Sequence, residues 1–323
     1  MYSIFTILIA ALLFTSYGYQ SDGTKRNQKQ EAGMKEVNVI GTDPKALIGE
    51  ASDIAITEKG NVLVVDKLEG CIKEFDRNGK LLNKFELQAD GSGNFKNPAR
   101  IGCSRDFIAV SENISSLINI FSIDFKFIRT IYAQGIVFDI CFDHDGFLWV
   151  GAFTGKKGKT LFKHDVEGKL IKTISLKHSS GDNFDDIFSL TITQNGLIIV
   201  AYVVLNAFEI WKTTGEFLSK FKNPLMKDRA EYTSMKLDLF SNQKVPEGTI
   251  TASICTDGNK FLYILGGTYS GNPMRDIFQF DLSGNYLKKF NSQNKLTKIL
   301  LDKSGYLFTI EKNRTLIKQY SVI

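Results

Sequence analysis

A unit of four short apolar segments separated by polar turns recurs along this chain, and it constrains the fold more than any other feature. The first copy occupies residues 53–85 and reads DIAITEKGNVLVVD, CIKEFDRNG and KLLNKF through its segments and turns. Further copies begin near residues 100, 139, 189, 253 and 298. The turn glycines that match Gly60 recur at roughly 40 to 60 residues per copy, close to the interval of propeller blades. The repeat therefore predicts an all-β, six-bladed β-propeller.

The second segment of each copy is apolar without interruption, as in VLVV at residues 62–65 and LIIV at residues 197–200. A strand with one face in water would alternate between apolar and polar residues. Continuous apolarity indicates a strand covered on both faces, as in the middle of a blade stacked between two others. We therefore expect four-stranded antiparallel blades packed face to face around an axis.

The sixth copy ends after its third segment, which leaves its sheet one strand short. An unpaired strand edge exposes backbone hydrogen-bonding groups, so folded proteins cover it. Residues 35–40 (KEVNVI) form the one spare strand-like segment and lie just before the first copy. We expect this N-terminal strand to complete the sixth blade and close the ring. The predicted propeller domain spans residues 35–323.

The N-terminal residues read as an export signal. Residues 4–14 (IFTILIAALLF) form an apolar run of the length of a signal-peptide core and shorter than a membrane span. We assign residues 1–18 to a signal peptide and residues 19–34 to a flexible linker, with an uncleaved N-terminal anchor as the alternative. The expected location is periplasmic or extracellular, with no transmembrane segment after cleavage.

Charge and cysteine content bound the function. The formal net charge of +5 is scattered along the chain, and no basic run is interleaved with aromatic residues, so nucleic-acid binding is not expected. The pattern is that of a monomer with a solvated surface. The chain has four cysteines, each inside an apolar segment. They fit buried free thiols, while an even number in an exported chain also permits two disulfides.

Propellers bind ligands where equivalent loops converge at the mouth of the central channel. Aligning the copies on their apolar segments places one polar residue of each at the start of its first strand. The six residues are Asp53, Arg100, Asp139, Ser189, Ser253 and Lys298. Opposite charges in this ring either pair and close the channel, or form a pocket. In a pocket, Arg100 would bind a carboxylate or phosphate bidentately, Lys298 would assist as a point charge, and the serines would bind hydroxyls.

The first copy resembles the NHL repeat in two motifs, GNVLVVD at residues 60–66 and IKEFDRNG at residues 72–79. The whole chain is similar to the exported six-bladed propeller proteins common in Bacteroidota. Six-bladed relatives include metal-dependent lactonases, and this resemblance implies a second possible activity. In that case Glu50 and Asp186, at matching positions of the first and fourth copies, would hold calcium across the axis, with Asp53 and Asp139 nearby. Arg100 and Lys298 would repel a cation at the same place.

Three other features of the sequence give weaker evidence for a function. His144, His164 and His178 all fall in the third copy, so they cannot ring the axis as zinc ligands. The DHDG segment at residues 143–146 fits a hairpin turn better than a calcium loop. Residues 222–249 form an insertion, either a cover for the channel mouth, a partner contact or an extended outer loop.

These observations predict an exported, non-enzymatic binding scaffold that recognises a small polar ligand, a peptide or an envelope protein at the channel mouth. The alternative is a calcium-dependent hydrolase or lactonase of the same architecture. A third option is a structural module within a larger envelope assembly.

Overall fold

The computed structural model describes residues 33–86, 97–154, 159–178, 184–185, 187–236, 242–267 and 274–322. The predicted signal peptide (1–18) and nearly all of the predicted linker (19–34) lie outside these residues. Within the described part of the chain, no helix is long and apolar enough to cross a membrane.

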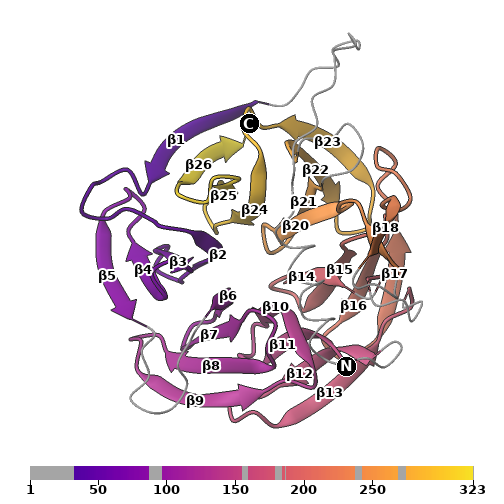
Figure 1. The fold of residues 1–323 in the computed structure, drawn as a ribbon, viewed down its shortest axis with the longest axis horizontal. Coiled ribbons are helices and arrows are strands. Elements are labelled where there is room, and N and C mark those ends of the chain that lie inside the picture. Colours follow the sequence, from indigo (N-terminus) through magenta and orange to yellow (C-terminus); the bar gives the residue numbers. More distant parts are fainter. Residues whose placement is uncertain are drawn as a thin grey trace.

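Six four-stranded antiparallel sheets surround a central axis, which confirms the predicted six-bladed propeller (Figure 1). Blade 1 contains β2 (Ala51–Ile56), β3 (Val62–Asp66), β4 (Cys71–Phe75) and β5 (Leu81–Glu86). Blade 2 contains β6 (Pro98–Cys103), β7 (Phe107–Glu112), β8 (Leu117–Ser122) and β9 (Phe127–Tyr132). Blade 3 contains β10 (Ile136–Phe142), β11 (Leu148–Phe153), β12 (Lys159–His164) and β13 (Leu170–Ser175).

The second half of the chain repeats this order. Blade 4 contains β14 (Phe188–Ile192), β15 (Leu197–Tyr202), β16 (Phe208–Lys212) and β17 (Phe217–Phe221). Blade 5 contains β20 (Thr251–Thr256), β21 (Phe261–Gly266), β22 (Asp276–Asp281) and β23 (Tyr286–Asn291). Blade 6 contains β24 (Leu296–Leu301), β25 (Tyr306–Glu311), β26 (Ile317–Val322) and, as its outermost strand, β1 (Met34–Ile40).

The N-terminal strand closes the ring as predicted. β1 pairs antiparallel with β26, from Met34 opposite Val322 to Ile40 opposite Ile317. The Lys318 ammonium adds an ion pair of 2.9 Å with Glu36 across this seam. Blade 6 therefore joins the two ends of the described chain, and the backbone edge of β26 is paired instead of exposed.

The core lies between neighbouring blades. The second strands are buried on both faces, and all five residues of β3 are buried. Between blades 1 and 2, for example, Leu63 and Val65 of β3 pack in one cluster with Ile108 and Val110 of β7. This arrangement explains the continuous apolarity of these segments.

The insertion predicted at residues 222–249 contains a two-stranded sheet of β18 (Tyr232–Lys236) and β19 (Asn242–Pro246). It is tied to the loop between β15 and β16, where the Asn206 amide donates to the carbonyl of Asn223 at 2.8 Å. The insertion thus packs on blade 4, and one of its residues, Thr249, reaches the wall of the cavity described below.

All four cysteines are free thiols. Cys71 and Cys255 are fully buried, and Cys103 and Cys141 are partly so. Burial raises the pKa of the Cys71 thiol to about 11 and that of Cys255 to about 12. They therefore remain protonated near neutral pH and act as small apolar side chains.

Candidate functional site

A cavity of about 310 Å³ lies on the axis, at the end of the propeller where the innermost strands begin. All six blades contribute to its wall, including Ser52 of blade 1, Arg100 of blade 2 and Thr297 of blade 6. Its position is that of the channel mouth predicted from the repeat. Five of the six predicted ring residues line it; these are Arg100, Asp139, Ser189, Ser253 and Lys298.

The six ring residues occupy equivalent positions in the six innermost strands. Each lies opposite the same position of the second strand of its blade, in the pairs Asp53–Val65, Arg100–Ser111, Asp139–Gly151, Ser189–Ala201, Ser253–Leu265 and Lys298–Ile310. In every blade except blade 4, a β-bulge directly precedes this residue. A bulge re-aims the side chain that follows it, so the local backbone directs these side chains toward the next blade and the axis.

Asp139 shows what this position does structurally. Its Oδ2 accepts hydrogen bonds from the Ser189 hydroxyl and from the backbone N–H of Leu190, both at 2.9 Å. Both donors belong to blade 4, while Asp139 belongs to blade 3. The Asp139 carboxylate therefore joins two neighbouring blades at the axis.

Two further junctions use the same position. The Asp53 carboxylate of blade 1 accepts from the backbone N–H of Ile101 in blade 2 at 3.2 Å. The Ser253 hydroxyl of blade 5 accepts from the backbone N–H of Ile299 in blade 6 at 3.3 Å. Part of the ring is therefore structural, as expected if opposite charges and hydroxyls hold the channel together.

Lys298 is neutralised by Asp53. The Lys298 ammonium lies 2.9 Å from Asp53 Oδ1, and the two side chains are 18% and 2% exposed. Burial alone would lower the pKa of Lys298, but the negative charges of Asp53 and Asp139 outweigh it and raise the pKa above its ordinary value. Lys298 is therefore a charged, structurally engaged residue that links blade 6 to blade 1.

Arg100 differs from the other charged members of the ring. Its Nε donates to the carbonyl of Phe138 at 2.9 Å, which fixes the plane of the guanidinium against blade 3. It forms no ion pair with any residue in the described ranges. The terminal nitrogens of a guanidinium can donate two parallel hydrogen bonds to a carboxylate or phosphate. Arg100 thus presents an oriented cation, without a carboxylate of its own, in the wall of the cavity.

The wall as a whole is basic. Its described residues include two acidic side chains, Glu50 and Asp139, against five basic ones. The basic residues are Lys67, Arg100, Lys298, Lys312 and Arg314. Glu50 is held by Arg314 at 3.0 Å and lies 3.9 Å from Lys67. With five basic and two acidic side chains, the described lining carries a net positive charge and favours an anion.

Of the two predicted calcium ligands, Asp186 lies outside the described residues. Glu50 is described, and its carboxylate accepts from the Arg314 guanidinium. Arg314 and Lys67 both approach Oε1 of Glu50, and their positive charges oppose a calcium ion at this carboxylate. The contact with Arg314 was not foreseen from the sequence, because Arg314 lies 264 positions further along the chain.

The histidines lie away from the cavity. His144 is exposed in the hairpin turn between β10 and β11, and His164 is buried in β12. His178 contacts the buried Glu209 carboxylate at 3.0 Å. Among the described lining residues there is neither a histidine nor a cysteine.

The DHDG segment is a hairpin turn. Asp143 Oδ1 accepts from the backbone N–H groups of Asp145 and Phe147, and its Oδ2 accepts from the Trp149 indole. Lys163 pairs with the same oxygen at 3.0 Å. The carboxylate therefore stabilises the turn of its own hairpin, as the turn interpretation predicted.

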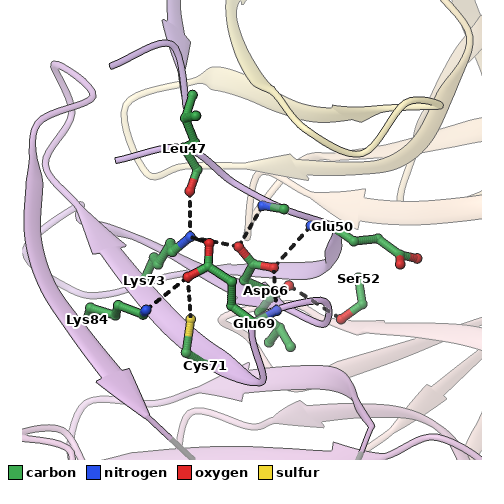
Figure 2. A network of polar contacts seen from close by, with 10 residues as sticks. Leu47, Glu50, Ser52, Asp66, Glu69, Cys71, Lys73 and Lys84 are labelled. Carbon is green, nitrogen blue, oxygen red and sulfur yellow. Dashed lines mark hydrogen bonds and ion pairs between the residues drawn. The ribbon is translucent and has the colours of Figure 1, made fainter. Parts of the chain in front are cut away.

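A buried network in blade 1, which the sequence reasoning missed, positions the loop that carries Glu50 (Figure 2). Asp66 accepts from the backbone N–H of Gly49 at 2.8 Å and from that of Glu50 at 3.0 Å. Lys73 donates to Asp66 at 2.8 Å and also to the carbonyl of Leu47. Residues 47–50 are thus fastened to the end of β3, and Glu50 is held at the rim of the cavity. The signal in the sequence was Lys73, which directly follows the two apolar residues Cys71 and Ile72 in the strand CIKEF.

The charges in this network balance one another. Burial by itself raises the pKa of Asp66, but the bonds from Lys73 and from three backbone N–H groups lower it below its ordinary value. Asp66, Glu69 and Cys71 place potential metal-ligand atoms within 4.8 Å of one another. The Lys73 ammonium, 2.7 Å from Glu69, already supplies the positive charge there. The cluster is therefore a structural ion-pair network.

Comparisons with known proteins agree on the fold. A family model described as a two component regulator propeller matches residues 131–154, from the end of β9 to just past β11. No curated protein sequence matches the chain. Virginiamycin B lyase from Staphylococcus aureus superimposes with a TM-score of 0.55 at 14% identity, covering 91% of this chain and 100% of that one.

Two other similar structures are of proteins that are not described as enzymes. The β-propeller domain of Myceliophteria thermophila Swd1 gives a TM-score of 0.54 at 11% identity and covers 90% of this chain and 100% of that one. A chain of the mitotic checkpoint complex gives 0.57 at 12% identity, covering 96% and 98%. At such identities these likenesses concern the fold alone, and the same fold serves enzymes and scaffolds.

Proposed function

We propose that the protein is an exported, non-enzymatic binding scaffold that captures an anionic ligand at the channel mouth. The ligand is a small molecule bearing a carboxylate or phosphate, or an acidic side chain or carboxyl end of a peptide or protein partner. The observation that carries this proposal is the oriented Arg100 guanidinium, without an ion pair to a described residue, in the wall of a basic cavity of about 310 Å³.

The other groups at the mouth fit the same chemistry. The Ser189 hydroxyl donates to Asp139, which leaves its oxygen lone pairs for a ligand hydroxyl. Lys298 is paired with Asp53, so we assign it a supporting electrostatic role and assign direct contact to Arg100. Thr249 of the insertion lies in the wall, which gives the insertion a route to influence binding.

The contacts made by the two acidic residues of the wall favour ligand binding over metal-assisted hydrolysis. Glu50 is ion-paired and Asp139 is bonded to the next blade, so neither described carboxylate of the wall is set apart for a metal or for proton transfer. One structural neighbour is a catalytically inactive lyase variant with quinupristin, which shows that a propeller of this kind receives a ligand in that protein.

The cellular setting is part of the proposal. Residues 1–18 would direct export, and the propeller would act as a monomer in the periplasm or outside the cell. The resemblance to NHL repeats and to exported propellers of Bacteroidota supports this setting.

A thermal-shift screen tests the proposal. The mature protein would be heated with phosphate, citrate, succinate and an acidic tetrapeptide, each at millimolar concentration and constant ionic strength. We expect at least one anion to raise Tm in the wild type and not in Arg100→Ala. Arg129→Ala, which removes an exposed arginine on β9, is the matched control and should keep the response. The absence of any shift in the wild type, or an equal shift in Arg100→Ala, would overturn the proposal.

A further inference from the structure

A second cavity lies beside a hairpin that departs from a rule followed in four other blades. In blades 1, 3, 4 and 5 the hairpin between the third and fourth strands contains a glycine with φ between 85° and 90°. The four are Gly79, Gly168, Gly215 and Gly284. A Cβ added at Gly168 would lie 2.8 Å from Ile131, and one at Gly284 would lie 2.6 Å from Phe221. These glycines therefore let each hairpin press against the outermost strand of the preceding blade.

Blade 2 has Phe125 at this place. The hairpin keeps the same turn, since the backbone N–H of Phe125 donates to the carbonyl of Ser122 at 2.9 Å. Its φ is 62°, a conformation that a bulky side chain adopts only at a cost in free energy. The ring stacks face to face on Phe85 of β5 in blade 1, with an interplanar angle of 4°. An aromatic side chain thus contacts the preceding blade at the position where blades 1, 3, 4 and 5 have a glycine.

A cavity of about 660 Å³ lies at this junction of blades 1 and 2. It is lined by the turns between β2 and β3, between β6 and β7 and between β8 and β9, together with β5. These turns lie at the opposite ends of the strands from the channel mouth. The cavity is therefore a separate site from the one assigned to anions. We call it the junction cavity.

One wall of the junction cavity is apolar and aromatic. It contains Phe85 and Phe125, together with Leu82 and Ile123. Leu82 is 42% exposed. Because Phe85 and Phe125 cover one face of each other, the rigid apolar surface that the pair can offer a ligand ring consists of its edges and outer faces.

The other part of the lining is an ordered array of hydrogen-bonding groups. Glu74 accepts from the Asn61 amide through one oxygen and from the Asn83 amide through the other, both at 2.7 Å. Each carboxylate oxygen keeps a further lone pair, and each amide keeps its own oxygen as an acceptor. Lys59 and Arg105 add donors at the edge. The wall therefore accepts and donates at fixed positions.

These two walls together match a ring that is apolar on its face and hydroxylated around its edge. A hydroxyl both donates and accepts, so it fits a wall that contains carboxylate, amide and basic groups. The charged lining residues are four acids and two bases, namely Glu58, Glu74, Asp106, Asp124, Lys59 and Arg105. The lining therefore disfavours an anion, while its carboxylates accept hydrogen bonds from neutral hydroxyls. We propose that the junction cavity binds a sugar ring of a neutral oligosaccharide.

To test the proposal, binding of the mature protein would be measured on an array of neutral and acidic glycans. The neutral oligosaccharide that binds most strongly would then be titrated into the protein by calorimetry. Phe125→Gly restores the glycine of the other blades, so the variant should fold, and it removes an aromatic ring from the cavity lining. Asn83→Ala removes an exposed amide from the polar wall. We expect both variants to bind at least tenfold more weakly than the wild type. Ile128→Ala, an exposed position on β9 outside the cavity, is the control and should bind normally.

Three results would overturn the proposal. One is the absence of neutral-glycan binding by the wild type. Another is binding that survives in both Phe125→Gly and Asn83→Ala. The third is binding confined to acidic glycans and lost in Arg100→Ala, which would assign it to the channel mouth. Because Arg100 lies outside the junction cavity, Arg100→Ala should leave neutral-glycan binding intact, and the two proposals fail independently.

Discussion

Lys298 and Asp53, 245 positions apart in the chain, form an ion pair of 2.9 Å between the last and first blades. Asp53 also accepts from the backbone of blade 2, so one carboxylate connects three consecutive blades. The pair lies on the axis beside the cavity and holds the ring closed from the inside, while β1 and β26 close it from the outside.

The first prediction concerns this pair. Asp53→Asn leaves the Lys298 ammonium without its neutralising carboxylate, and breaking a buried pair in this way costs roughly 3 to 5 kcal/mol. We expect urea unfolding to show a loss of about 3 kcal/mol. Glu216→Gln, which removes an exposed partner of Lys212, should cost less than about 1 kcal/mol. Equal, small losses in both variants would show that the axial pair contributes little.

The second prediction concerns pH. Asp66 has a folded-state pKa below its ordinary 3.8, so its carboxylate stabilises the fold at neutral pH. That stabilisation is present above the pKa of the unfolded chain and is lost as pH falls through the lower folded pKa. Asp66→Asn should therefore be less stable than the wild type at pH 7, and the difference should shrink as the pH falls below about 4. A difference that stays constant as the pH falls would contradict the assignment.

The third prediction concerns ring closure. Removing residues 1–40 deletes β1 and exposes the backbone edge of β26. We expect a lower urea midpoint and association of the truncated protein in size-exclusion chromatography, because open strand edges pair with other chains. Removing only residues 1–32 keeps β1 and should leave both properties unchanged. A stable monomer lacking residues 1–40 would show that β1 is dispensable.

Most of the fold was predictable because burial on both faces leaves a continuous apolar pattern that repeats with each blade. The closing strand followed from the missing fourth segment of the last copy, and the structure confirms it. The equivalence of Asp53 and Lys298 followed from the alignment of copies. Their pairing did not, since the alignment left closure and pocket formation both open.

Other parts of the site were hidden for physical reasons. Glu50 meets Arg314 because the β25–β26 turn converges on the loop before β2, a contact that no local pattern encodes. Phe125 did leave a signal, because the hairpin of the second copy reads SIDF where the others end in glycine. The assignment to NHL repeats, the export signal and the ligand remain predictions.

The fourth prediction concerns metals. Because Glu50 is bound to Arg314, we expect EDTA and added calcium to leave the Tm of the mature protein unchanged. A ligand present at a hundred times its Kd stabilises by about 2.7 kcal/mol, which such a measurement detects. A lower Tm in EDTA that calcium restores, and that is absent in Glu50→Gln, would support the calcium-dependent hydrolase instead.

The most direct test of the central claim is a calorimetric titration of the anion selected by the thermal-shift screen into wild type, Arg100→Lys and Arg100→Ala. If Arg100 binds the anion bidentately, the Kd should rise in Arg100→Lys and rise further, by about 10- to 100-fold over the wild type, in Arg100→Ala. Wild-type affinity should also weaken as ionic strength increases. An unchanged Kd in Arg100→Ala would place the anion elsewhere and contradict the assignment of the channel mouth as the binding site.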